Sequence, residues 1–67
     1  MNLIINGENV QVPESLEVVS DLLQHFQLGE KVVIVEVNAN ILEKDQHART
    51  RLTNGDRVEI VHFVGGG

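Results

Sequence analysis

One amphipathic helical stripe limits the folds open to this chain of 67 residues more than any other feature of the sequence. Four apolar residues recur with the i, i+3, i+4 and i+7 spacing of a helix that buries one face: Val19, Leu22, Leu23 and Phe26. Gly29 follows as a natural helix stop, and Ser15 is a candidate N-cap. The spacing predicts a single helix over roughly residues 18–28, with the four stripe residues in the core.

A β-hairpin is predicted before this helix. Asn6-Gly7 is the residue pair preferred in a two-residue type I′ turn, and it separates two short apolar runs. Glu8 and Asn9 could also belong to the turn, which leaves the register of the hairpin open. Pro13 ends the second strand because it has no backbone N–H to donate.

Strands are also predicted after the helix. Residues 32–37 form a β-branched run with no polar alternation before Glu36, which is typical of a strand covered on most of both faces. Ile41-Leu42 is long enough only for a very short strand. A turn that contains Asn and Gly then leads into the last strand, residues 57–64.

The order of these elements predicts the fold class. One helix cannot cover both faces of a sheet, so we expect an α+β domain in which a mixed sheet of four to five strands curls around one helix. This is the β-grasp arrangement, in which the first and last strands lie side by side and parallel in the middle of the sheet. We expect a single β-grasp domain over residues 1–64, followed by a flexible glycine tail at residues 65–67.

The last strand predicts a docking surface. Because side chains alternate along a strand, Val58 and Ile60 share one face, and Val61 and Phe63 share the other. If the first pair meets the helix, Val61 and Phe63 are exposed beside the tail and form an apolar patch for partner docking. The alternative is that Phe63 folds back over the sheet edge.

The chain sequence ends in Gly65-Gly66-Gly67, directly after the predicted strand. Glycine lacks a Cβ, so such a tail can enter a narrow channel in a partner, and three residues extend on the order of 10 Å. This reach would carry the Gly67 carboxylate into a partner's active site, with Gly65 and Gly66 inserted behind it. The alternative interpretation is a frayed end or an expression scar.

Composition excludes several function classes. Ten acidic and five basic residues give a formal net charge of −5, which argues against a nucleic-acid binder. An acidic surface suits steering towards a basic protein partner, and it equally suits plain solubility. The chain contains no cysteine and no run long enough to span a membrane, which fits the reducing cytoplasm. A domain this small also leaves little room for a deep substrate pocket, so we do not expect an independent enzyme.

The residues also offer no catalytic or metal-binding constellation. His25, His47 and His62 lack the spacing of metal ligands and are expected to be solvated or packed. Glycine is scattered except at the end, so no phosphate-binding loop is expected and no cofactor should bind to this chain. The Gly67 carboxylate remains, and an ionised carboxylate must be activated before it can donate an acyl group. An ATP-using partner is therefore implied, and the chain would be its substrate or carrier.

The sequence resembles the ThiS family, the ubiquitin-like bacterial sulfur carrier proteins of thiamin biosynthesis. The resemblance covers essentially the whole chain and rests on five segments: the Asn6-Gly7 hairpin, Val19-x-x-Leu22-Leu23, Val35-Glu36-Val37-Asn38, Asn54-Gly55-Asp56-x-Val58-Glu59-Ile60 and Val64-Gly65-Gly66-Gly67. The last of these is the most specific.

The resemblance implies a pathway for the tail. An adenylating, E1-like enzyme would use ATP and Mg²⁺ to convert the Gly67 carboxylate to an acyl-adenylate, and a sulfur donor protein would then replace AMP to leave a thiocarboxylate. Thiazole synthase, a TIM-barrel enzyme, would take that sulfur into the thiazole ring. The family pattern requires two terminal glycines, here Gly66 and Gly67, so Gly65 is an additional one.

Other function classes share these features. The small subunit of molybdopterin synthase has the same fold, tail and thiocarboxylate, although those chains are usually longer. A ubiquitin-like protein modifier would also need a free Gly-Gly end, and only its product, an isopeptide bond to lysine, would distinguish it. A β-grasp binding module would need no such end.

Overall fold

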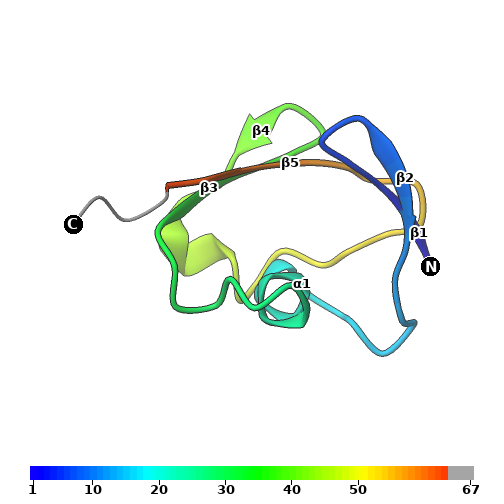
Figure 1. Cartoon of the computed structure of the whole chain (residues 1–67), viewed down its shortest axis with the longest axis horizontal. Helices are drawn as coiled ribbons and strands as arrows, with labels where there is room; N and C mark the ends of the chain where they lie inside the picture. Colours follow the sequence, from blue (N-terminus) through cyan, green and yellow to red (C-terminus); the bar gives the residue numbers. More distant parts are fainter. Residues whose placement is uncertain (64–67) are drawn as a thin grey trace.

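In the computed structural model, which describes residues 1–63, a single mixed sheet packs against one helix (Figure 1). The elements along the chain are β1 (Asn2–Ile5), β2 (Glu8–Gln11), α1 (Val19–His25), β3 (Val33–Val37), β4 (Asn40–Ile41), the 3-10 helix η1 (Lys44–Gln46) and β5 (Arg57–His62). The strand order in this part of the chain is β2-β1-β5-β3-β4. The predicted β-grasp fold is confirmed. The predicted division at residue 64 lies outside the described residues.

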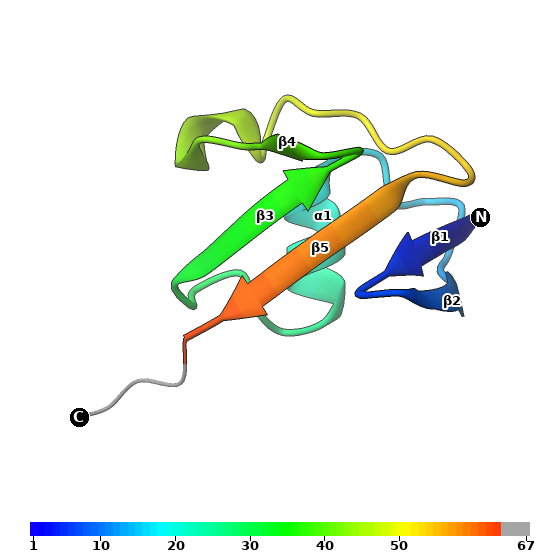
Figure 2. The same cartoon turned by 90° about the horizontal axis from the view of Figure 1, so that it is seen from above.

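Strand β5 occupies the centre of the sheet (Figure 2). It pairs in parallel with β1, where Ile5 is in register with Val58, and antiparallel with β3 from Val33↔His62 to Val37↔Val58. The predicted parallel pairing of the first and last strands is therefore confirmed. Because β5 extends past β1, its second half is held mainly by β3.

An asparagine side chain continues the β1–β5 pairing beyond the last residue of β1. Asn6 and Gly7 have φ values of 50° and 84°, as the predicted type I′ turn requires. The Oδ1 atom of Asn6 accepts a hydrogen bond of 2.8 Å from the Ile60 N–H, and its Nδ2 donates one of 3.2 Å to the Ile60 carbonyl oxygen. The Asn6 amide thus replaces a strand residue as the partner of Ile60.

The helix begins later than the candidate cap at Ser15 suggested. The Asp21 carboxylate accepts hydrogen bonds from the backbone N–H groups of Glu17 (3.0 Å) and Val18 (3.1 Å), and these bonds lower the pKa of Asp21. The first N–H groups of a helix have no partner inside it. Here a segment later in the chain provides one, because the Val19 N–H donates to the Thr50 carbonyl oxygen at 3.0 Å. Capping therefore comes from Asp21 and from residues distant in sequence.

The helix also ends earlier than predicted, at His25. Gln27 has a φ of 63°, and the Leu28 N–H donates to the Leu23 carbonyl oxygen at 2.7 Å. These are the features of a Schellman motif, in which a residue with left-handed backbone usually follows the helix. The stop is therefore at Gln27, and the prediction that Gly29 ends the helix was wrong by two residues.

The core lies between the helix and one face of the sheet. Its buried residues are Leu3, Val12, Val19, Leu22, Leu23, Val35, Val37 and Val58. Phe26 was predicted there but is 39% exposed, because it follows the last helical residue and stacks edge-on against His25. The expectation that the β3 run is covered on both faces was also wrong, since the helix covers only one.

Asn6 and Gln27 both have left-handed backbone and both lie outside the β3–β4 turn, so glycine substitutions at these two positions give a matched test. Replacing Asn6 with Gly keeps the turn but removes two hydrogen bonds to Ile60, so we expect a loss of about 1–2 kcal/mol in unfolding free energy. Gln27→Gly removes only the strain of a positive φ and should gain up to about 1 kcal/mol. Urea unfolding of both variants checks the two signs. Equal effects at both positions would show that the Asn6 amide contributes nothing.

Candidate functional site

The face of the sheet opposite the helix carries an exposed apolar surface. In an antiparallel pair, residues in register share a face, so Ile34 of β3 lies beside Val61 of β5. The Phe63 N–H donates to the Val32 carbonyl oxygen at 3.2 Å, which continues this pairing past the end of β5. We call the following exposed side chains the open-face patch: Val32, Ile34, Ile41, Val61 and Phe63.

The structure exposes both predicted docking residues. Val61 is 52% exposed and Phe63 is 50% exposed, whereas Val58 is buried beneath the helix. The expected alternation of β5 is therefore confirmed, and Phe63 does not fold into the core. Binding by Val61 and Phe63 stays a prediction.

The glycine tail itself, Gly65, Gly66 and Gly67, lies outside the described residues. The described residues end at Phe63, two positions before the tail in the sequence. Strand β5 runs away from β1 and towards the end of the sheet where β3 starts (Figure 2). The open-face patch members Val32 and Phe63 lie at that same end, so the apolar surface lies next to the residues that precede the tail.

Sequence reasoning missed three members of the patch: Val32, Ile34 and Ile41. The β-branched run from which Val32 and Ile34 come lacks alternating polarity, so its pattern did not show which side chains face solvent. The number of helices was the available signal, because one helix leaves one face of a sheet uncovered.

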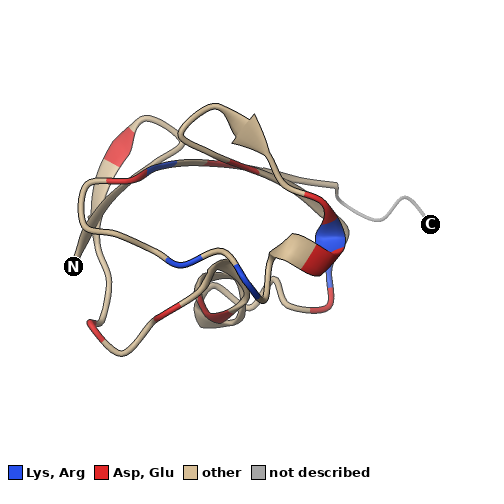
Figure 3. Cartoon of the chain, turned by 180° about the vertical axis from the view of Figure 1, so that it is seen from behind, with Lys and Arg blue, Asp and Glu red and all other residues tan. Residues whose placement is uncertain are grey.

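Acidic residues outnumber basic ones ten to five in the chain, and Figure 3 shows both kinds distributed along the fold. Glu36 of β3 and Glu59 of β5 are in register with one another on the open face, one rung of that face away from Ile34 and Val61. Arg57 precedes Glu59 by two residues and belongs to the same face of β5. The open face is therefore apolar near Phe63 and carries charged side chains, Glu36, Glu59 and Arg57, farther along β5 and β3.

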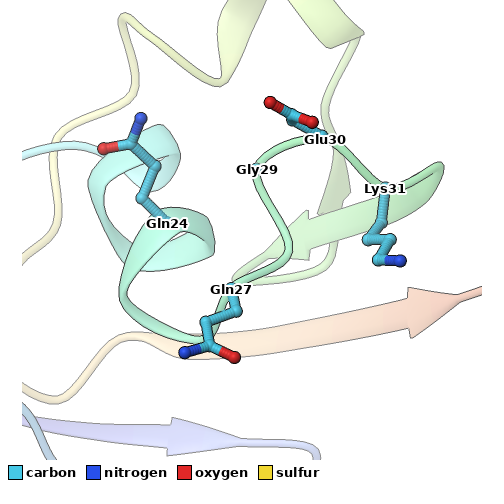
Figure 4. Close-up of a pocket in the computed structure, with 5 residues that line it drawn as sticks. All are labelled: Gln24, Gln27, Gly29, Glu30 and Lys31. Carbon is cyan, nitrogen blue, oxygen red and sulfur yellow. The ribbon is translucent and has the colours of Figure 1, made fainter.

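The surface depression beside the C-terminal end of the helix does not resemble an active site. It measures about 460 Å³ and is lined by Gln24, Gln27, Gly29, Glu30 and Lys31 (Figure 4). The Gln24 and Gln27 side chains point away from one another across it, and the lining contains no nucleophile paired with a base. Among residues 1–63, no group of three His, Asp or Glu side chains could hold a metal ion. The helices of the described segment include none long and apolar enough to cross a membrane.

The histidines divide into one buried and two exposed residues. His25 and His62 are exposed, whereas His47 is only 9% exposed and its Nε2 atom has no hydrogen-bond partner within residues 1–63. Burial lowers the pKa of His47 from its ordinary value of 6.5, and the positive charge of Lys44 lowers it further. The backbone carbonyl oxygen of His47 accepts the Ser20 N–H at 2.8 Å, so this segment also caps the helix. His47 therefore has a packing role, as expected from the sequence.

Comparison with known proteins connects this geometry to a family. The model of the ThiS family matches residues 2–67. The chain is 43% identical to the sulfur carrier protein ThiS of Bacillus subtilis over 65 residues, which cover 97% of this chain and 98% of that protein. It is also similar to the thiazole synthase of Paramagnetospirillum magneticum, with 39% identity over 67 residues that make up 20% of that protein.

A solved structure gives the same result for the fold. The crystal structure of the thiamine biosynthesis protein ThiS from Geobacter metallireducens has a TM-score of 0.82 and 35% identity, with the alignment covering all of both chains. This similarity extends beyond the sheet order, because the alignment includes the whole length of each protein.

His47 provides a prediction about pH. Because the fold disfavours protonated His47, its full contribution to stability is present above pH 6.5 and declines as the pH falls and the unfolded chain takes up the proton first. We expect the melting temperature to fall between about pH 7 and pH 5, and His47→Phe to reduce that fall. Thermal melts across this range provide the measurement, with His25→Gln as an exposed control. An unchanged pH dependence in His47→Phe would contradict the assignment.

Proposed function

Because the chain belongs to the ThiS family and is a sulfur carrier of thiamin biosynthesis, not a catalyst, we propose that Gly67 carries the sulfur as a C-terminal thiocarboxylate. The family model matches the chain through residue 67 and so includes all three tail glycines, which supports Gly67 as the residue that carries the sulfur. Strand β5 supports the proposal as well, since it leads from the centre of the sheet directly to the tail.

The proposed chemistry has two steps. An oxygen of the Gly67 carboxylate attacks the α-phosphorus of ATP, pyrophosphate leaves, and the acyl-adenylate forms. Sulfide (HS⁻) delivered by the sulfur donor then attacks the acyl carbon, AMP leaves with the former carboxylate oxygen, and loss of the proton leaves a thiocarboxylate in which sulfur replaces one oxygen. Mg²⁺ would neutralise the phosphate charge in the first step. We assign ATP and Mg²⁺ to an adenylating partner, since the described residues offer neither a phosphate-binding loop nor a metal cluster.

Three partners follow from this scheme. An E1-like adenylating enzyme activates Gly67, a sulfur donor protein supplies the sulfur, and thiazole synthase accepts it. The relation to thiazole synthase has independent support, because a thiazole synthase contains a region 39% identical to this chain. We propose the cytoplasm as the site of these reactions, because its reducing conditions protect a thiocarboxylate sulfur from oxidation.

We further propose that Val61 and Phe63 dock the carrier onto the adenylating enzyme, with Gly65 and Gly66 inserted into its active site. An exposed apolar surface of this kind normally marks a binding site. Because the patch lies at the end of β5, two residues before Gly65 in the sequence, docking and insertion of the tail could occur together, with the folded body outside the channel. Docking a fixed number of residues before Gly67 would bring the carboxylate within reach of ATP in the partner's active site.

The tail chemistry can be tested by intact mass. Incubation of the chain with ATP, Mg²⁺, a sulfur source and the cognate adenylating enzyme should add the mass of one oxygen-to-sulfur exchange. A chain without Gly66 and Gly67 should gain no mass, because its reach is about 7 Å shorter and errors of about 1 Å can already cost a hundredfold in rate. Its melting temperature should match that of the intact chain. A protein modifier would instead appear joined to lysines and never carry sulfur.

The docking role has a matched control in the second phenylalanine. Phe63→Ala should weaken binding to the adenylating enzyme about tenfold while changing the melting temperature little, because the side chain is half exposed. Phe26→Ala truncates the other exposed phenylalanine, away from the open face, and should leave affinity unchanged. Calorimetric titration and thermal melts measure both quantities. If Phe63→Ala lowers stability strongly and leaves the affinity of the folded protein unchanged, Phe63 is a structural residue instead.

A further inference from the structure

The open face contains a pair of like charges that the fold does not need. Glu36 and Glu59 are directly opposite one another in the antiparallel pairing of β3 and β5. Residues in that position have Cβ atoms roughly 4.5–5.5 Å apart, and like charges there destabilise the sheet. Both side chains are half-buried, so water screens their repulsion incompletely.

Neither carboxylate is compensated within the described part of the chain. The ion pairs of residues 1–63 involve Glu14 and Asp45, and neither Glu36 nor Glu59 accepts a hydrogen bond through its side chain there. Arg57 belongs to the same strand face but forms no ion pair with either glutamate. Within residues 1–63, an acid pair without an ion-pair partner therefore lies at the centre of the sheet.

The acid pair is continuous with the apolar surface. The neighbouring rung of the open face is Ile34 and Val61, and the next one towards the tail is Val32 and Phe63. Ile41 of β4 is in register with Glu36 and borders the pair on its other side. One stripe thus runs along β3 and β5 from two carboxylates, through apolar side chains, to the residues that precede the tail.

We propose that the adenylating partner inserts an arginine side chain between Glu36 and Glu59 while its apolar surface covers the open-face patch. This inference rests on the proposed function and specifies the chemistry of the partner's contact surface. A guanidinium group can donate to two carboxylates at once and is desolvated more readily than an ammonium group. The repulsion present in the free carrier would be relieved on binding, which favours the complex.

Charge argues against a second copy of this chain as the occupant. Two molecules in a symmetric contact through this face would bring four carboxylates together, and each molecule already carries a formal net charge of −5. A partner with complementary positive charge is favoured on the same grounds.

The test compares two double variants with the same change in net charge. Glu36→Gln with Glu59→Gln should weaken binding to the cognate adenylating enzyme about tenfold and reduce the salt dependence of binding. Its melting temperature should stay equal or rise, since a repulsion is removed. The control, Glu8→Gln with Glu30→Gln, changes exposed glutamates outside the open face and should alter affinity less than about twofold.

Weaker binding together with an unchanged or higher melting temperature supports the proposal, because loss of a purely structural role would lower both the affinity and the melting temperature. Wild-type affinity in the Glu36/Glu59 variant, or a dimer that this variant strengthens in sedimentation analysis, would overturn it. The intact-mass assay separates the two levels of inference. If the wild-type chain gains sulfur but the acid pair does not affect affinity, only the arginine contact fails; if the wild-type chain never gains sulfur, the proposed function fails first.

Discussion

Strand β5 joins the two halves of the sheet, and its pairing with β1 is the interaction on which the rest of the structure depends. The Asn6 N–H donates to the Val58 carbonyl oxygen at 2.9 Å, and the Asn6 side chain then satisfies both backbone groups of Ile60. These bonds link strands separated by most of the chain. Without them the β1–β2 hairpin would have no neighbour in the sheet, and Leu3 would lose its place in the core that it shares with Val58.

The same central strand connects the core to the candidate site. Its side chains alternate, so Val58 is fully buried under the helix while Val61 is more than half exposed on the other face. The domain has one helix in its described part, and the sheet consequently keeps one face free for a partner. The open-face patch and the acid pair are thus consequences of an architecture in which burial and recognition use opposite sides of β5. A carrier whose chemistry is completed by other enzymes needs such a surface more than it needs a pocket.

The strongest sequence signals were local ones. The Asn6-Gly7 turn, the helix stripe through Leu22 and Leu23, and the alternation of β5 each predicted the observed element, because their side-chain types restrict the backbone directly or repeat with the period of one element. The order of the elements then predicted the β-grasp fold, since a single helix allows few ways to cover a sheet. The resemblance to the ThiS family predicted the role in sulfur transfer.

What the sequence by itself determined was therefore the type and order of the strands and the α-helix, the three buried residues of the helix stripe and the family. The tertiary structure decided which face of the β3 run stays exposed, because a continuous β-branched run has no polar residue to mark it. It also decided that Glu36 stands opposite Glu59, since register between distant strands comes from the packing of the whole sheet. The tertiary structure also decided where the helix begins. The carbonyl groups of residues 47 and 50 accept hydrogen bonds from the N-terminus of α1, and only folding brings those distant residues to it.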